Sequence, residues 1–172
     1  MIFRDLRADE IECRVAMVKT NGLQLLLYKN SRTDAIILDE TVGAENWQRK
    51  HNECKGNLYC SVGINVNYAK PDTEERWIWK EDCGSESNME KEKGEASDSF
   101  KRTMAINWGL GRELYTAPFI WISADKCDIN NGKCYDKFEV EKIIIENKQI
   151  TAVAIKNVTK GVRAFVWQRN PQ

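Results

Sequence analysis

Apolar residues recur at helical spacing between residues 93 and 115, and this segment is the longest periodic pattern in the chain. Residues four apart share one side of a helix, because an α-helix has about 3.6 residues per turn. The stripe formed in this way consists of Ala96, Phe100, Met104 and Trp108. We expect one long helix that packs this stripe on a core and ends at Gly109 and Gly111.

Two adjacent cations lie off this stripe. Lys101 falls on its flank, and Arg102 falls nearly opposite Phe100. A helix anchored on one side then projects a basic pair from the other, and such a pair can hold a phosphate chain. Spacing alone favours the alternative, an ordinary solvated helix face.

Apolar and polar residues alternate with period two on both sides of the helix, which predicts strands. Asn21-Gly22 between two apolar runs predicts an opening hairpin. The predicted strands cover residues 12–18, 23–29, 47–53, 58–69, 76–80, 119–123, 135–145, 149–156 and 162–168. Within residues 58–69 one face is apolar, and the other is left for solvent or a ligand.

A short helix is predicted from residue 31 to residue 42, ended by Gly43. The expected caps are Thr33 or Asp34, and the expected inward-facing residues are Ala35, Ile36 and Asp39. Candidate caps for the long helix are Ser85, Ser87 and Asn88.

These elements predict an α+β protein: an antiparallel β-sheet meander packed against one long central helix, with a C-terminal β-rich segment. Its 172 residues and 42% hydrophobic content suit one domain with a core. We expect a single domain over residues 1–172, with its core at 32–123 and a β-rich extension at 124–172. The extension either joins the first sheet or forms an appendage, and the loop 125–134 is the boundary.

The charges cancel, with 26 Lys and Arg against 26 Asp and Glu, so a basic surface must be local. The first twelve residues lack an apolar export signal, and no window resembles a membrane span. We expect a soluble cytoplasmic protein whose 6 cysteines are reduced. Because no C-x-x-C pair occurs, zinc is not expected, although Cys127 and Cys134 could face each other across a hairpin.

The helical segment resembles the Rad-fifty-two family of single-strand annealing proteins, including the phage recombination proteins grouped with it. The residues that carry this resemblance are Lys93, Ser97-Asp98, Phe100-Lys101-Arg102, Trp108-Gly109 and Gly111. Upstream, Glu40, Gly43 and Trp47 are similar to the family's short helix, which ends in glycine before the strands. The resemblance covers residues 32–115, about half of the chain.

The resemblance implies a curved sheet with a helix packed on it, protomers in a ring or arc, and single-stranded DNA held between the sheet and helix layers. It implies binding and annealing of complementary strands without ATP, in homologous recombination and double-strand break repair. The protein would be phage-encoded and act in the bacterial host cytoplasm. Candidate further partners are a phage exonuclease and a single-strand-binding protein. No catalytic residue, metal or cofactor is expected.

Family members place the Lys-Arg pair against the DNA backbone and often add a basic residue one turn on, where this chain has Ala105. The sequence also offers a basic hairpin and a basic position before the short helix. The candidate nucleic-acid-binding residues are Lys101, Arg102, Lys93, Arg112, Arg32, Arg49, Lys50 and Lys55. Aromatic residues on the meander that could stack bases are Tyr59, Tyr68, Trp77 and Trp79. Trp77 and Trp79 share a face, and this placement favours a core or interface role over base stacking.

Two alternatives of other classes remain. A metal-dependent nuclease could use carboxylates alone, with Asp72 and the later Glu146-Asn147-Lys148 as a loose signature. A non-catalytic interaction domain would dock a partner on its helix. Histidine chemistry is not expected, because His51 is the only histidine, and Gly109-Leu110-Gly111 lacks the lysine of a phosphate loop.

Overall fold

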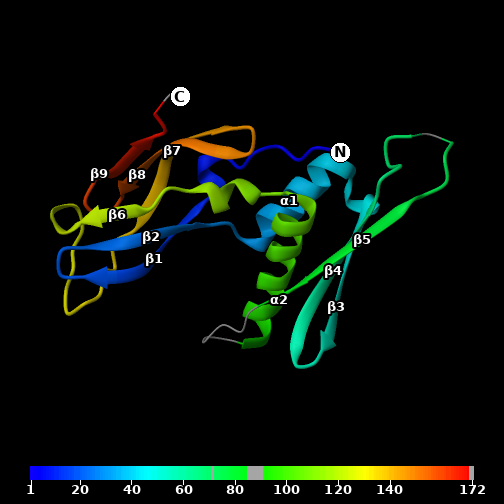
Figure 1. Ribbon diagram of the computed structural model, residues 1–172, viewed down its shortest axis with the longest axis horizontal. Coiled ribbons are helices and arrows are strands. Elements are labelled where there is room, and N and C mark those ends of the chain that lie inside the picture. The colour runs from blue at the N-terminus through cyan, green and yellow to red at the C-terminus, as the bar shows by residue number, and fades with distance from the viewer. Residues whose placement is uncertain (71, 85–90, 171–172) are drawn as a thin grey trace. The chain divides into compact units, whose positions relative to one another are not determined.

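The computed structural model describes residues 1–70, 72–84 and 91–170, apart from the side chains of residues 91–93. The chain forms two compact units, coloured along the sequence in Figure 1. The first unit consists of Met1–Arg4 and Asn30–Gly111, and the second of Asp5–Lys29 and Arg112–Gln172. Helices and antiparallel strands make the protein α+β, as predicted. The predicted caps at residues 85, 87 and 88 lie outside the described residues.

The first unit contains a three-stranded antiparallel sheet in the order β3-β4-β5. Its strands are β3 (Trp47–Cys54), β4 (Asn57–Asn65) and β5 (Trp77–Cys83). The predicted meander is therefore confirmed. The middle strand ends at Asn65 rather than at residue 69, because the Tyr68 amide bonds to the Asn65 carbonyl at 3.2 Å and turns the chain.

Two α-helices of 12 residues each belong to this unit, α1 (Ser31–Val42) and α2 (Lys91–Arg102). A π-helical turn, Thr103–Trp108, continues α2 and ends at Gly109, whose φ of 84° is left-handed. The helical content is thus divided between two helices, instead of forming one long central helix. The predicted stripe reaches the core, since Phe100 and Met104 are fully buried.

The start and the inner face of α1 differ from the prediction. Its cap is Asn30, whose side chain accepts a hydrogen bond from the Thr33 amide at 2.9 Å, instead of Thr33 or Asp34. The helix buries Ile37 and Leu38, while Ile36 is exposed. The predicted inner residues lie two positions, or about half a turn, from the buried ones, so they face the opposite side of the helix. Ala35 and Asp39 are not among the buried residues either.

Both helices cover the same face of the three-stranded sheet. Trp47 of β3 stacks on Phe100 of α2 with ring centroids 6.1 Å apart, and its indole N–H donates to Asp39 of α1 at 2.6 Å. Side chains alternate across a strand, so the residues paired with Trp47 and its second neighbours share this face. We call it the helix face and the opposite side the open face. The β4 residues buried on the helix face are Cys60, Val62 and Ile64.

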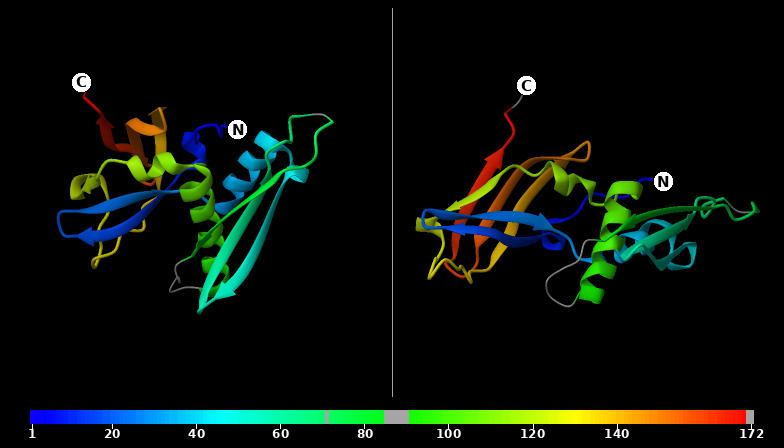
Figure 2. Two further views of the ribbon diagram at one scale, coloured as in Figure 1. Left: turned by 45° about the vertical axis from the view of Figure 1, so that its right-hand side comes forward. Right: turned by 60° about the horizontal axis from the view of Figure 1, so that its bottom comes forward.

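The second unit is built on a six-stranded sheet in the order β6-β2-β1-β7-β8-β9, whose edge strands curl toward each other (Figure 2). Its strands are β1 (Glu12–Lys19), β2 (Gly22–Tyr28), β6 (Ile120–Ser123), β7 (Phe138–Glu146), β8 (Gln149–Asn157) and β9 (Val162–Gln168). Short 3-10 turns in the chain cover Ala8–Glu10, Ala44–Asn46, Arg112–Thr116 and Ala124–Lys126.

The predicted opening hairpin and the three C-terminal strands are confirmed, and the structure joins them through β1 and β7. Strand β6 pairs with β2 inside the second unit, so residues 120–123 belong with the N-terminal hairpin. Pairing between strands about 100 residues apart leaves no local trace in the sequence.

Candidate nucleic-acid interface

The predicted basic pair lies where the end of α2 meets the outer strand β5. On the helix face, Lys80 and Asp82 project from β5 toward the helical segment. The Arg102 guanidinium lies 3.5 Å from the Asp82 carboxylate. The Lys80 ammonium donates to the Asn107 carbonyl at 2.8 Å and lies 4.4 Å from the centroid of the Trp108 ring. We call this line of contacts the α2–β5 seam.

Arg102 is the incompletely bonded cation of the seam. Its side chain is 42% exposed, so the guanidinium reaches solvent. Its Nε is buried, and none of the described residues accepts a hydrogen bond from it. A buried donor without an acceptor costs free energy, commonly about 1–3 kcal/mol. An incoming oxygen anion cannot reach the buried Nε, but it could reach the exposed part of this weakly paired guanidinium.

Lys101 differs from its neighbour. Its side chain is only 17% exposed, and its ammonium lies 3.9 Å from Asp98, one turn earlier in α2. The sequence placed both cations on a projecting face, whereas the structure leaves Arg102 on the seam and covers most of Lys101. Removal of the Lys101 charge therefore affects the seam at longer range than removal of Arg102.

Lys80 is the seam residue that the sequence analysis did not single out. It pairs with Val62 across the sheet, and Val62 is fully buried on the helix face. The signal was present, because strand alternation places Lys80 on the opposite side from its neighbour Trp79. Lys80 directly follows Trp79 in the sequence. Its contacts with the helical segment could be recognised only once the strand register was known.

The remaining predicted cations lie elsewhere in the first unit. Arg49 is on the helix face of β3, 4.9 Å from the Phe100 ring centroid, and Lys50 is on the open face. Lys55 is exposed in the β3–β4 turn, with a φ of 52°. Arg32 is exposed in the first turn of α1. These residues do not join the seam.

Arg112 belongs to the second unit, where it is exposed at the start of a 3-10 turn. Lys93 lies in the first turn of α2, and its side chain is outside the described part of the chain. A basic track through these two residues thus remains a prediction.

The open face carries aromatic side chains from two strands. Trp77 and Trp79 of β5 stack with ring centroids 6.4 Å apart, and Trp79 is 39% exposed. The Lys50 ammonium of β3 lies 4.5 Å from the Trp79 ring centroid. Tyr59 of β4 lies on the same face, and its pKa is raised chiefly by the neighbouring Cys83 thiol, then by burial of the phenol and by Cys54.

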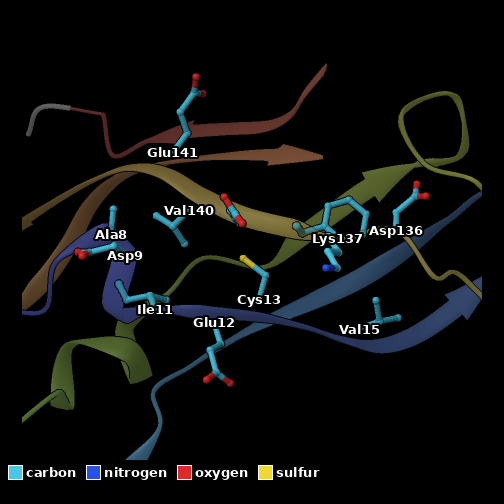
Figure 3. A pocket seen from close by; sticks show the side chains of 12 residues that line it. Ala8, Asp9, Ile11, Glu12, Cys13, Val15, Asp136, Lys137, Val140 and Glu141 are labelled. Atoms are coloured by element: carbon cyan, nitrogen blue, oxygen red, sulfur yellow. The ribbon is translucent and has the colours of Figure 1, made fainter. Parts of the chain in front are cut away.

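A pocket of about 810 Å³ opens in the second unit between β1 and β7, which share a single paired position (Figure 3). Burial, together with the charge of Glu139, raises the pKa of the Cys13 thiol there to about 12. Carboxylates dominate the lining, which includes Asp9, Glu12, Asp136, Glu139 and Glu141. This lining repels phosphate, so the pocket does not suit a nucleic-acid backbone.

The described residues contain no group of three or more His, Cys, Asp or Glu side chains placed to hold a metal ion. Asp72 and Glu146, from the loose nuclease signature, belong to different units. All cysteines are free, including Cys127 and Cys134. Among the helices of the described chain, none has the length and apolar character needed to cross a membrane.

The chain was compared with known proteins in three ways. No family model, no curated protein and no solved structure matches it.

Proposed function

We propose that the protein binds single-stranded DNA at the α2–β5 seam and anneals complementary strands without ATP, as in homologous recombination and double-strand break repair. The observation that carries this proposal is the Arg102 guanidinium, whose side chain is 42% exposed and which has only a 3.5 Å ion pair to Asp82. A phosphate can form charge-assisted hydrogen bonds with the exposed part of this guanidinium. The resemblance of residues 93–111 to annealing proteins supports the same ligand.

The mechanism follows from the chemistry of the seam. Arg102 and Lys80 neutralise phosphates, which fixes the strand without reading its sequence. Homology is then tested by base pairing, so base edges must remain accessible when two coated strands meet. No bond is made or broken, and neither a nucleotide nor a metal takes part. The β3–β4–β5 meander with α2 would correspond to the family's curved sheet and helix.

The wider proposal follows the family. Copies of the chain assemble as a ring or arc along the strand, and a phage exonuclease or single-strand-binding protein is a candidate partner. The protein would be phage-encoded and work in the cytoplasm of the bacterial host. A carboxylate-dependent nuclease and a protein-interaction domain are the functions that the experiment below must separate from this one.

The test is removal of the basic pair, Lys101→Ala with Arg102→Ala. Because Arg102 contacts a phosphate and Lys101 acts at longer range, affinity for oligothymidylate should fall, and the log–log salt slope should become shallower by about 0.7 per protomer, the change for one contact. The matched control, Lys160→Ala with Arg163→Ala, removes the same charges from exposed positions in the second unit. The measurement is fluorescence anisotropy at several salt concentrations, with circular dichroism melts as a check on folding.

Wild-type affinity and salt slope in the double variant would show that the pair is an ordinary helix face. Binding and annealing should both survive EDTA, and single strands should remain uncut in Mg²⁺. Strand cleavage that EDTA abolishes would support the nuclease instead. If the wild-type protein binds no single-stranded DNA at low salt, the protein-interaction domain is the function that remains.

A further inference from the structure

Trp79 lies flat on the open face of the three-stranded sheet. Gly63 is its cross-strand partner on β4. A Cβ atom added to Gly63 would come within 2.6 Å of the Trp79 ring, so the ring rests directly on the β4 backbone. One face of the indole therefore contacts the sheet, and the other points away from it.

A charged group also lies over the Trp79 ring. The Lys50 ammonium lies 4.5 Å from its centroid, and Lys50 itself is exposed. Trp77 continues the aromatic surface along β5, with its ring plane inclined 28° to that of Trp79. The nearby carboxylate of Glu81 is bound by the Ser61 hydroxyl at 2.9 Å. The open face thus offers flat rings with a cation that can move aside.

We infer that this open face stacks unpaired bases of the single strand held at the seam. The inference rests on the proposed function and names a second contact for the same ligand. A base takes the place of the Lys50 ammonium on Trp79, and the ammonium turns to a flanking phosphate. Both surfaces belong to β5, the outer strand of its sheet, since Lys80 and Trp79 are adjacent on opposite faces.

The occupant is single-stranded nucleic acid because the site combines exposed rings with a lysine. Every base has a π-face, so stacking on aromatic side chains tolerates any sequence. Stacking also leaves the pairing edges of the base free, which annealing requires. A protein partner or a second copy of the chain would cover these rings too, and the experiment separates those cases.

The test compares oligothymidylate with an abasic strand of equal length, which keeps the phosphates and lacks the bases. Wild-type protein should bind oligothymidylate more tightly by roughly 5- to 150-fold, the range for one stacked base. Trp79→Ala should lose most of this preference while its affinity for the abasic strand stays within about twofold. Gly63→Ala, whose methyl group displaces the indole, should lose part of the preference for oligothymidylate.

The control is Trp121→Ala, which removes a ring from the stacked Phe119–Trp121 pair of the second unit. This variant should keep the preference for oligothymidylate.

Equal wild-type affinity for the two strands would overturn the stacking inference and leave phosphate binding at the seam intact. Failure to bind either strand would overturn the proposed function and this inference together. If Trp79→Ala changes the mass of the assembly and not the strand preference, the open face is an interface between copies, and the inference fails. Circular dichroism of each variant checks that a lost preference is measured on folded protein.

Discussion

Arg102 must exchange one anion for another if it is to hold a phosphate. Its present partner, Asp82, is 18% exposed and accepts a hydrogen bond from the Cys83 amide at 2.8 Å. The carboxylate is therefore fixed beside the guanidinium and repels any phosphate that approaches. A partly exposed ion pair contributes little, about 0–1 kcal/mol, so a phosphate can displace it. In the proposed site, Asp82 would weaken phosphate binding, and its ion pair would also orient the guanidinium.

The prediction at the residue scale is that Asp82→Asn tightens binding of single-stranded DNA. The asparagine carbonyl can still accept from the Cys83 amide, while the negative charge beside Arg102 is lost. Affinity for oligothymidylate should rise roughly 1.5- to 5-fold, because 0.2–1 kcal/mol of competition is removed. Fluorescence anisotropy at fixed salt measures the change.

Glu146→Gln is the control for net charge, since Glu146 is exposed at the end of β7 in the second unit. An equal rise in both variants would assign the effect to overall charge. Weaker binding in Asp82→Asn would mean that Asp82 serves to position Arg102.

The candidate site could be predicted in part at this scale. Lys101 and Arg102 stand side by side in a periodic segment, so their residue types and spacing were visible. Their different environments were not visible, because the strand register is what places Asp82 and Lys80 at the seam. The flat contact of Trp79 on Gly63 depends on the same register.

Helix α1 illustrates what limits prediction of single elements. Its existence and its end at Gly43 followed from sequence. Several polar residues near its start could serve as the cap, and Asn30 precedes the ones chosen. Consecutive residues lie about 100° apart around a helix, so Ile36, Ile37 and Leu38 cannot all face the core equally. Packing on the rest of the first unit decides that Ile37 and Leu38 are buried and Ile36 is not.

The prediction at the element scale is that Asn30→Ala destabilises the first unit by about 0.5–2 kcal/mol, the usual range for loss of an N-cap. The Thr33 amide loses its acceptor at 2.9 Å, and alanine offers no replacement. Denaturant unfolding followed by far-ultraviolet circular dichroism measures the change.

Asn30→Asp keeps the acceptor and should unfold like wild type, because a negative charge is also favourable at a helix N-terminus. Equal stability of the alanine and wild-type proteins would show that the Asn30 side chain contributes nothing to the start of α1.

The whole molecule was the least predictable level. Each hairpin follows from turn residues and alternation, which are local. The division into two units does not, because the chain passes between the units three times, between Arg4 and Asp5, between Lys29 and Asn30, and between Gly111 and Arg112. The pairing of β6 with β2 leaves no recognisable pattern in the sequence of either strand. Fold class could thus be predicted, while the sheet to which each strand belongs could not.

The prediction at the scale of the whole molecule is that the protein is a multimer. The first unit's sheet has only three strands, and its outer strands β3 and β5 pair with a neighbour on one side only within the described chain. Edge strands present unpaired backbone groups that another chain can complete. Light scattering after gel filtration at micromolar concentration should give a mass that is a multiple of 19.9 kDa, with and without oligothymidylate. The mass should persist in Lys101→Ala with Arg102→Ala, because these side chains belong to α2 and their removal leaves the backbone edges of β3 and β5 unchanged. A mass of 19.9 kDa in both conditions would count against assembly and against the ring-forming family as a guide to this chain.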